Sequence, residues 1–216
     1  MNLLVKICGV TTAKDAEMAA ELGADAIGVN FWPGSKRYVD PAEAGPILAA
    51  IPAGILKVGV FVNEPEEDVA FQMDALGLDR VQLHGDERPG DYLHLDPARL
   101  IRAVRVRDAA SFAAASGWKP ALWLYDAFVD GFGGGGLPAP WPLIAKNARR
   151  PFLLAGGLTP ENVASAIQAT RPEGVDVASG VERSPGSPGS PGSPGSPRMK
   201  DPAKVAAFIA AARAAI

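Results

Sequence analysis

The sequence contains a single cysteine, Cys8, and only two histidines, His84 and His94, among its 216 residues. An internal disulfide needs two cysteines, and structural zinc and iron–sulfur sites use several cysteine or histidine ligands. The scarcity of both residue types excludes a disulfide framework and argues against a metal site. A lone cysteine is typical of proteins in a reducing compartment, and we expect a cytoplasmic location.

Long apolar runs and a strong net charge are also missing. The N-terminal stretch has an apolar run of only a few residues before charged residues follow, which is too short for a signal peptide or a membrane span. The net charge is only −3, so neither nucleic acid nor an anionic membrane is expected as a partner. A small phosphorylated ligand is still compatible with this charge, because local amides and one or two cations are enough to hold it.

Short runs rich in β-branched residues alternate with longer alanine-rich helical patterns. The predicted strands cover residues 3–8, 26–31, 56–62, 80–84, 100–106, 121–126, 152–155 and 175–178. The predicted helices cover residues 13–22, 41–50, 65–76, 109–115, 142–148, 160–169 and 202–215. Eight such alternations favour a single α/β domain, a closed (β/α)8 TIM barrel. An open doubly wound sheet, which usually has five or six strands, is the alternative.

Residues that favour helix ends accompany these patterns. The predicted N-caps are Thr12, Asp40, Glu64, Asp108, Thr159 and Asp201. The glycines predicted to stop helices are Gly23, Gly77 and Gly117. The connection after the fourth strand, residues 85–96, has no clear helical pattern and is predicted to be short or irregular.

Residues 184–198 form a tandem SPG repeat. Its prolines and glycines prevent a helix and leave nothing apolar to bury, so we expect a flexible or polyproline-like surface loop between the last strand and the last helix. The domain prediction is therefore one barrel over residues 1–216 that carries this loop. An expansion in a tolerant loop is the simplest interpretation, and a lid or docking strip is the alternative.

In a TIM barrel, the chemistry lies at the C-terminal strand ends and the loops that follow them. Alternation places Lys6 and Cys8 on one face of the first strand, so Cys8 is expected at the barrel mouth, unless it is a buried apolar residue. Asp126 ends the sixth strand and is expected either at the mouth or in a cap or ion pair. Two such titratable groups are the minimum for paired proton abstraction and donation.

Glycines follow the seventh and eighth strands, where barrels commonly bind phosphate through backbone N–H groups. The predicted phosphate-binding residues are Gly156, Gly157, Ser179 and Gly180. Arg37, after the second strand, is either a carboxylate-binding cation or a solvated loop residue. His84, after the fourth strand, either contacts substrate or is satisfied by neighbouring loops, whereas His94 lies outside any motif and is expected at the surface.

Six motifs, in this order and spacing, resemble the phosphoribosylanthranilate isomerase family over nearly the whole chain. They are KICGVT (6–11), GVNFWPGSKRYV (28–39), VGVFVN (58–63), VQLHGDE (81–87), AGGLTPENV (155–163) and DVASGVE (176–182). The resemblance implies a (β/α)8 barrel that catalyses an Amadori rearrangement of N-(5-phosphoribosyl)anthranilate in tryptophan biosynthesis, without cofactor or metal. It implies that Cys8 is the general base, Asp126 the general acid and Arg37 the group that binds the anthranilate carboxylate.

The chain departs from this family pattern in two loops. The glycine-rich stretch 131–137 lacks the family's threonine, and the SPG stretch is expanded.

The alternative functions are a related histidine-pathway isomerase or dual-substrate barrel, a Schiff-base aldolase using Lys6, and a non-catalytic phosphate-binding barrel. The first of these families has aspartate where this chain has Cys8. We expect a monomer by default, with a homodimer as the alternative.

Overall fold

The structure, a computed structural model, describes residues 3–128, 139–184 and 198–216. Eight parallel strands pair in chain order and close into a barrel, which excludes the open sheet. The strands are β1 Leu4–Cys8, β2 Ala26–Asn30, β3 Leu56–Phe61, β4 Arg80–Leu83, β5 Leu100–Val106, β6 Leu122–Ala127, β7 Phe152–Leu154 and β8 Gly174–Val177. Each predicted strand is confirmed to within two residues at either end.

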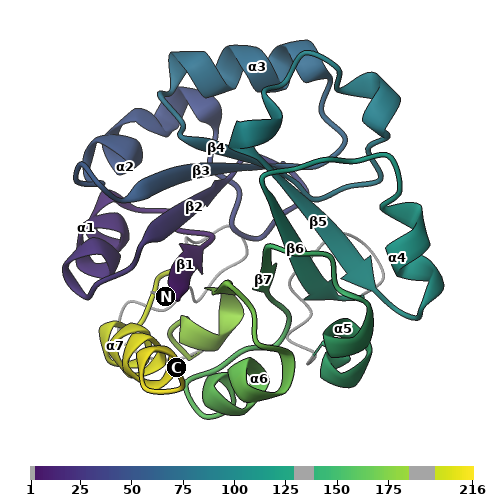
Figure 1. Ribbon diagram of the computed structural model, residues 1–216. Helices are drawn as coiled ribbons and strands as arrows, with labels where there is room; N and C mark the ends of the chain where they lie inside the picture. Colours follow the sequence, from purple (N-terminus) through teal and green to yellow (C-terminus); the bar gives the residue numbers. More distant parts are fainter. Residues whose placement is uncertain (1–2, 129–138, 185–197) are drawn as a thin grey trace.

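Helices surround the barrel, and α7 packs against both α1 and α6 and so completes the ring (Figure 1). The α-helices are α1 Ala13–Glu21, α2 Gly45–Ala49, α3 Glu66–Ala75, α4 Ala110–Ala114, α5 Trp141–Asn147, α6 Val163–Thr170 and α7 Pro202–Arg213. The 3-10 turns are η1 Pro41–Glu43, η2 Pro89–Asp91, η3 Pro97–Arg99 and η4 Ser179–Val181. None of the described helices is long and apolar enough to cross a membrane.

Two predicted helices differ from the structure. The helix predicted over 41–50 is split into η1 and α2, because Pro46 lacks an N–H and fits only the first turn of a new helix. The helix predicted over 160–169 begins at Val163, after a turn in which the Asn162 side chain accepts the N–H of Thr159 at 2.8 Å. As predicted, the connection after β4 contains only the short turns η2 and η3.

Most of the predicted helix ends are confirmed. Thr12 and Asp201 cap α1 and α7 through their side chains, and Asp40 caps η1. The three predicted stop glycines all have positive φ. Glu64, Asp108 and Thr159 are wrong as N-caps, because Pro65, Ala109 and Asn162 occupy those positions. The Asp108 side chain still accepts the N–H of Ala110 at 2.9 Å.

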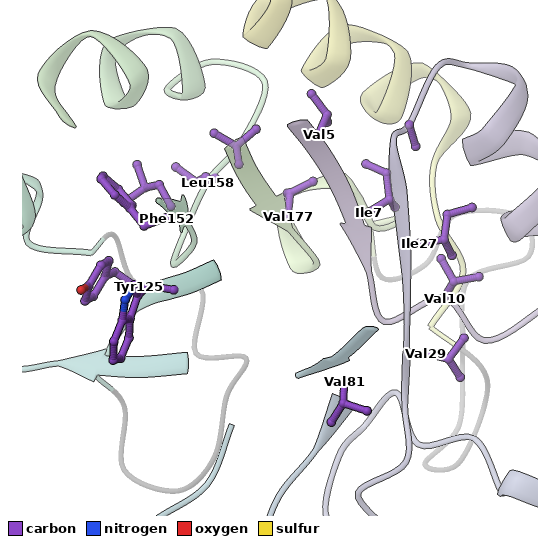
Figure 2. Packing of buried hydrophobic residues seen from close by; sticks show 14 of the residues in the cluster. Val5, Ile7, Val10, Ile27, Val29, Val81, Tyr125, Phe152, Leu158 and Val177 are labelled. Atoms are coloured by element: carbon purple, nitrogen blue, oxygen red, sulfur yellow. The ribbon is translucent and has the colours of Figure 1, made fainter. Parts of the chain in front are cut away.

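Alternation along the strands divides the core into two layers. Val5 and Ile7 of β1 and Val177 of β8 lie on the helix-covered side, in the larger apolar cluster (Figure 2). Figure 2 also shows Tyr125 of β6 near Phe152 of β7, and their ring centroids are 5.4 Å apart. Burying such large rings between strand and helix supplies much of the folding free energy, about 25 cal/mol per Å² of apolar surface.

The barrel interior changes character along its axis. Its lower part is apolar, formed by residues such as Val58, Ile101 and Leu153. Nearer the mouth it holds the buried polar side chains of Lys6, Gln82 and Asp176. Burying a charged side chain costs free energy unless it is paired. The polar part of the interior therefore indicates the position of a functional site.

Candidate active site

Cys8 ends β1 with its side chain inside the barrel mouth, on the same face as Lys6, as alternation predicts. It pairs in register with Gly28 of β2. A Cβ atom at residue 28 would lie 2.9 Å from the Cys8 Sγ and 3.1 Å from the Lys6 Nζ. The bare backbone of Gly28 therefore makes room for the thiol and the ammonium side by side.

A buried ion pair lies next to this thiol. The Lys6 Nζ is 2.9 Å from the Asp176 Oδ1, and the two residues are register partners on β1 and β8. Burial alone lowers the pKa of Lys6, but the nearby Asp176 and Cys8 outweigh it and raise this pKa, so Lys6 stays charged. Lys6 is thus a fixed cation at the base of the site.

The thiol itself is held in its neutral form. Burial raises the pKa of Cys8, and the Asp176 carboxylate raises it further, whereas Lys6 and then Lys200 act in the opposite direction. The thiolate is therefore the minority form at neutral pH, and the nearby cations determine the fraction of Cys8 that is ionised.

Asp126 lies near the C-terminal end of β6 at the same mouth. Its Oδ1 accepts the N–H of Ala127 at 2.7 Å, and its Oδ2 is 3.3 Å from the His84 Nε2. The His84 Nδ1 lies 2.9 Å from the Gln82 Nε2. With the Gln82 amide as donor, a neutral His84 carries its proton on Nε2, facing the carboxylate. Asp126 is thus at the mouth and also partly capped, which combines the two predicted alternatives.

The predicted phosphate loops lie against one another. Gly156 and Gly157 have φ values of +88° and +61°, and the Asn162 side chain holds the second glycine by donating to its carbonyl oxygen at 2.9 Å. A Cβ atom at Gly180 would lie 1.9 Å from the Leu158 carbonyl oxygen. Only glycine permits this approach between the loops after β7 and β8.

The backbone amides of these loops are available to a ligand. Within the described residues, the N–H groups of Gly156, Gly157, Ser179 and Gly180 donate to no protein acceptor. Converging unpaired amides of this kind form an anion-binding concavity. The loop after β7 also contacts the acid side, because a Cβ atom at Gly156 would lie 2.9 Å from the Asp126 Oδ1.

Arg37 lies on the base side of the mouth. Its side chain crosses Gly9, where a Cβ atom would lie 2.2 Å from the Arg37 Cδ. Its Nε donates to the Glu182 Oε1 at 2.5 Å, and the Lys200 Nζ lies 3.4 Å from the same oxygen. Arg37 is therefore a largely buried, paired cation rather than a solvated loop residue.

Sequence reasoning missed four residues of this region: Gly28, Asp176, Glu182 and Lys200. Three of them lie in the recognised motifs, but nothing in their spacing shows which side chains they meet. Lys200 follows the repeat and is fully buried; burial lowers its pKa to about 8 despite the nearby Glu182. In the sequence, the only feature that distinguishes Lys200 is that it precedes Asp201, the predicted N-cap of the last helix.

The other predicted positions are also placed. His94 is exposed, as predicted, and its backbone N–H donates to Glu66. Within the described residues, no group of three or more histidine, cysteine or acidic side chains is arranged to hold a metal ion. The glycine-rich stretch 131–137 lies outside the described residues, as does the repeat apart from its ends.

A closed β/α barrel with a cysteine, an aspartate and two glycine-lined loops at its C-terminal strand ends defines a (β/α)8-barrel enzyme. The family model for N-(5'-phosphoribosyl)anthranilate (PRA) isomerase matches residues 5–191. The isomerase of that name from Dechloromonas aromatica is 41% identical over 100% of this chain and 98% of its own length. The one from Rubrobacter xylanophilus is 45% identical over 84% and 91%.

Solved structures agree with these sequences. The phosphoribosylanthranilate isomerase of Thermotoga maritima superposes with a TM-score of 0.81 at 37% identity, covering 98% of this chain and 99% of its own. A structure of such an isomerase with reduced 1-(o-carboxyphenylamino)-1-deoxyribulose 5-phosphate gives a TM-score of 0.77 at 36% identity over the same shares. The chain belongs to the phosphoribosylanthranilate isomerase family and is an isomerase of tryptophan biosynthesis.

Proposed function

We propose that the chain converts N-(5-phosphoribosyl)anthranilate into 1-(2-carboxyphenylamino)-1-deoxyribulose 5-phosphate, with Cys8 as general base and Asp126 as general acid. The observation that carries this assignment is the position of both side chains at the mouth of one barrel, beside loops with unpaired amides. They come from β1 and β6, which are three places apart around the barrel with β7 and β8 between them, so a sugar fits between an acid and a base.

The two groups act in sequence. Protonated Asp126 gives its proton to the ribose ring oxygen, the C1–O bond breaks and a Schiff base forms between C1 and the aryl nitrogen. The Cys8 thiolate then removes the proton from C2, and the C2–H electrons form the double bond of an enolamine. The enolamine then tautomerises, gaining a proton at C1 and losing the proton of its 2-hydroxyl group, which gives the ketose. Cys8 gives up the proton it removed and Asp126 regains one, so both groups return to their starting forms. Each positioned proton transfer of this kind contributes on the order of 10²–10⁴-fold in rate.

The remaining residues bind and orient the substrate. The amides of Gly156, Gly157, Ser179 and Gly180 hold the 5-phosphate, and Arg37 takes the anthranilate carboxylate. His84 lies 3.3 Å from Asp126 and contributes to the binding surface by fixing the orientation of that carboxyl group. The reaction moves protons within one molecule and leaves its overall oxidation level unchanged, so neither a redox cofactor nor a metal is required.

We propose that the enzyme acts as a cytoplasmic monomer. The single cysteine is buried and unbridged, which suits a reducing compartment. The large hydrophobic side chains exposed among the described residues are Tyr38, Phe71, Leu93 and Ile216, which are spread along the chain. Light scattering across a concentration series tests the oligomeric state, and a constant mass of two chains would contradict the monomer.

Turnover of freshly prepared phosphoribosylanthranilate tests the activity. We expect the purified chain to remove the anthranilate fluorescence in a single exponential at limiting substrate. A preparation that is folded but inactive would refute the assignment. The aminoimidazole substrate of the histidine pathway serves as the comparison, and preference for it would favour the related isomerase.

A further inference from the structure

Glu182 is a buried acid for which the proposed mechanism has no use. Its side chain is 8% exposed and accepts the Arg37 Nε at 2.5 Å. A carboxylate is costly to bury at a barrel mouth, and at this mouth it lies beside the one arginine assigned to substrate. The contact therefore calls for a role of its own.

The geometry of the guanidinium group suggests that role. Arginine presents five N–H donors in a planar fork, and a carboxylate binds two of them at once along one edge. Glu182 occupies the Nε, while the two terminal amino groups of Arg37 have no hydrogen-bond partner among the described residues. The edge formed by these amino groups matches a carboxylate, and the contact with Glu182 fixes the direction in which that edge points.

Lys200 adjusts the charge of this pair. Its Nζ donates to the Ala178 carbonyl oxygen at 3.0 Å and lies 3.4 Å from Glu182. With Lys200 protonated, two cations and one anion leave the cluster with one net positive charge. One substrate carboxylate neutralises it.

A backbone pairing holds this cluster where the SPG repeat leaves the barrel. Glu182 and Lys200 form an antiparallel bridge, flanked by hydrogen bonds from Arg183 N to Met199 O and from Asp201 N to Val181 O, at 3.1 and 2.9 Å. The two ends of the repeat thus meet at a paired stalk, residues 181–183 and 199–201. The position of Glu182 is set by that stalk.

We propose that Glu182 is a positioning residue that gives the site its preference for an aryl carboxylate, by fixing the outer edge of Arg37. This inference rests on the proposed function, because it takes the Arg37–carboxylate contact as given. Glu182 touches no reacting atom, so its loss changes discrimination between substrates more than it changes the proton transfers.

The test compares two reduced product analogues, one with the ortho carboxylate and one with a bare phenylamino group. Calorimetry gives the ratio of their dissociation constants, which is insensitive to the fraction of folded protein. We expect Glu182→Ala to raise the dissociation constant of the carboxylated analogue about tenfold relative to that of the bare one, because only the carboxylated analogue is weakened. Glu182→Gln, whose amide oxygen still accepts the Arg37 Nε, should restore the ratio to within about threefold.

Lys204→Met is the matched control. Lys204 lies at the same stalk, and its side-chain Nζ donates to the Glu182 carbonyl oxygen and to the Ser184 Oγ and not to the Glu182 carboxylate. It should leave the ratio unchanged. An unchanged ratio in Glu182→Ala, or equal weakening of both analogues, would overturn the proposal while the proposed function stands. If the wild type binds neither analogue, the proposed function fails and this inference fails with it.

Discussion

The two sides of the barrel mouth surround their reactive groups with different electrostatics. On the side of β1 and β8, Cys8 lies beside buried, paired charges, with Lys6 held by Asp176 at 2.9 Å. On the side of β6, Asp126 accepts a backbone N–H and lies 3.3 Å from the His84 Nε2. The charges of the base side are buried next to the thiol, whereas on the acid side Arg105, the register partner of Asp126 on β5, forms an ion pair with the exposed Asp86.

The difference follows from what each group must do. A thiol becomes a base only as an anion, and a buried anion needs nearby cations. A carboxylic acid donates only while it holds its proton, and a fixed cation beside it would remove that proton. The two sides therefore differ in how their cations are used: Lys6 and Lys200 act on the Cys8 thiol, and Arg105 on the acid side is paired with Asp86.

Removing Cys8 or Asp126 should have the largest effect, because the comparison of the two sides assigns each of them one proton transfer. We expect Cys8→Ala and Asp126→Asn each to lower kcat by at least about 100-fold, because each eliminates one proton transfer. Binding of the reduced product analogue, measured by calorimetry, should survive in both. A rate within a few-fold of wild type for either variant would remove that residue from the mechanism.

Gly180→Ala should break the phosphate loops that both sides share. The new Cβ atom would lie 1.9 Å from the Leu158 carbonyl oxygen, so the loops after β7 and β8 must separate. A displacement of about 1 Å in bound substrate costs on the order of 100-fold in kcat/KM. Gly45→Ala is the matched control, because nothing lies within 4 Å of its added atom. Equal kinetics for the two variants would show that these loops do not bind phosphate.

The charges of the base side should shift its pH profile in opposite directions. Activity rises with pH as Cys8 loses its proton. Lys6→Met removes a cation that lowers the pKa of Cys8, so the rising limb moves to higher pH. Asp176→Asn removes an anion that raises this pKa, so the limb moves to lower pH.

Each single variant also leaves one buried charge unpaired, which costs about 3–5 kcal/mol of unfolding free energy. The double variant Lys6→Met/Asp176→Asn removes both charges and should recover most of that loss in urea denaturation. A shift of both single variants in the same direction would contradict the assignment of Cys8 as the titrating base.

Shortening the SPG repeat should have the smallest effect. Deletion of residues 186–197 leaves the paired stalk with its Glu182–Lys200 bridge. A twofold change in the length of a loop alters its closure free energy by only about 0.6 kcal/mol. We expect steady-state kinetics within about threefold of wild type. A larger loss would assign the repeat a function as a lid or docking strip.

Local signals in the sequence were enough for the architecture and for part of the site. The period of two along β1 put Lys6 and Cys8 on the inner face, and the structure confirms that placement. Three of the six predicted N-caps, Thr12, Asp40 and Asp201, were right, and Glu64, Asp108 and Thr159 were not. The Asn162 side chain folds back on Thr159, a competition between side chains that propensity does not rank.

Contacts between distant residues were decided only by the tertiary structure. Lys6 meets Asp176, and Arg37 meets Glu182, across more than 140 positions of sequence. Barrel closure brings β8 next to β1 and so makes these pairs, and no local pattern contains that information. The sequence by itself determined which residue types stand at the strand ends. The fold decided which of these residues are neighbours, and neighbouring charges and burial shift the pKa values of groups such as Lys6, Cys8 and Lys200.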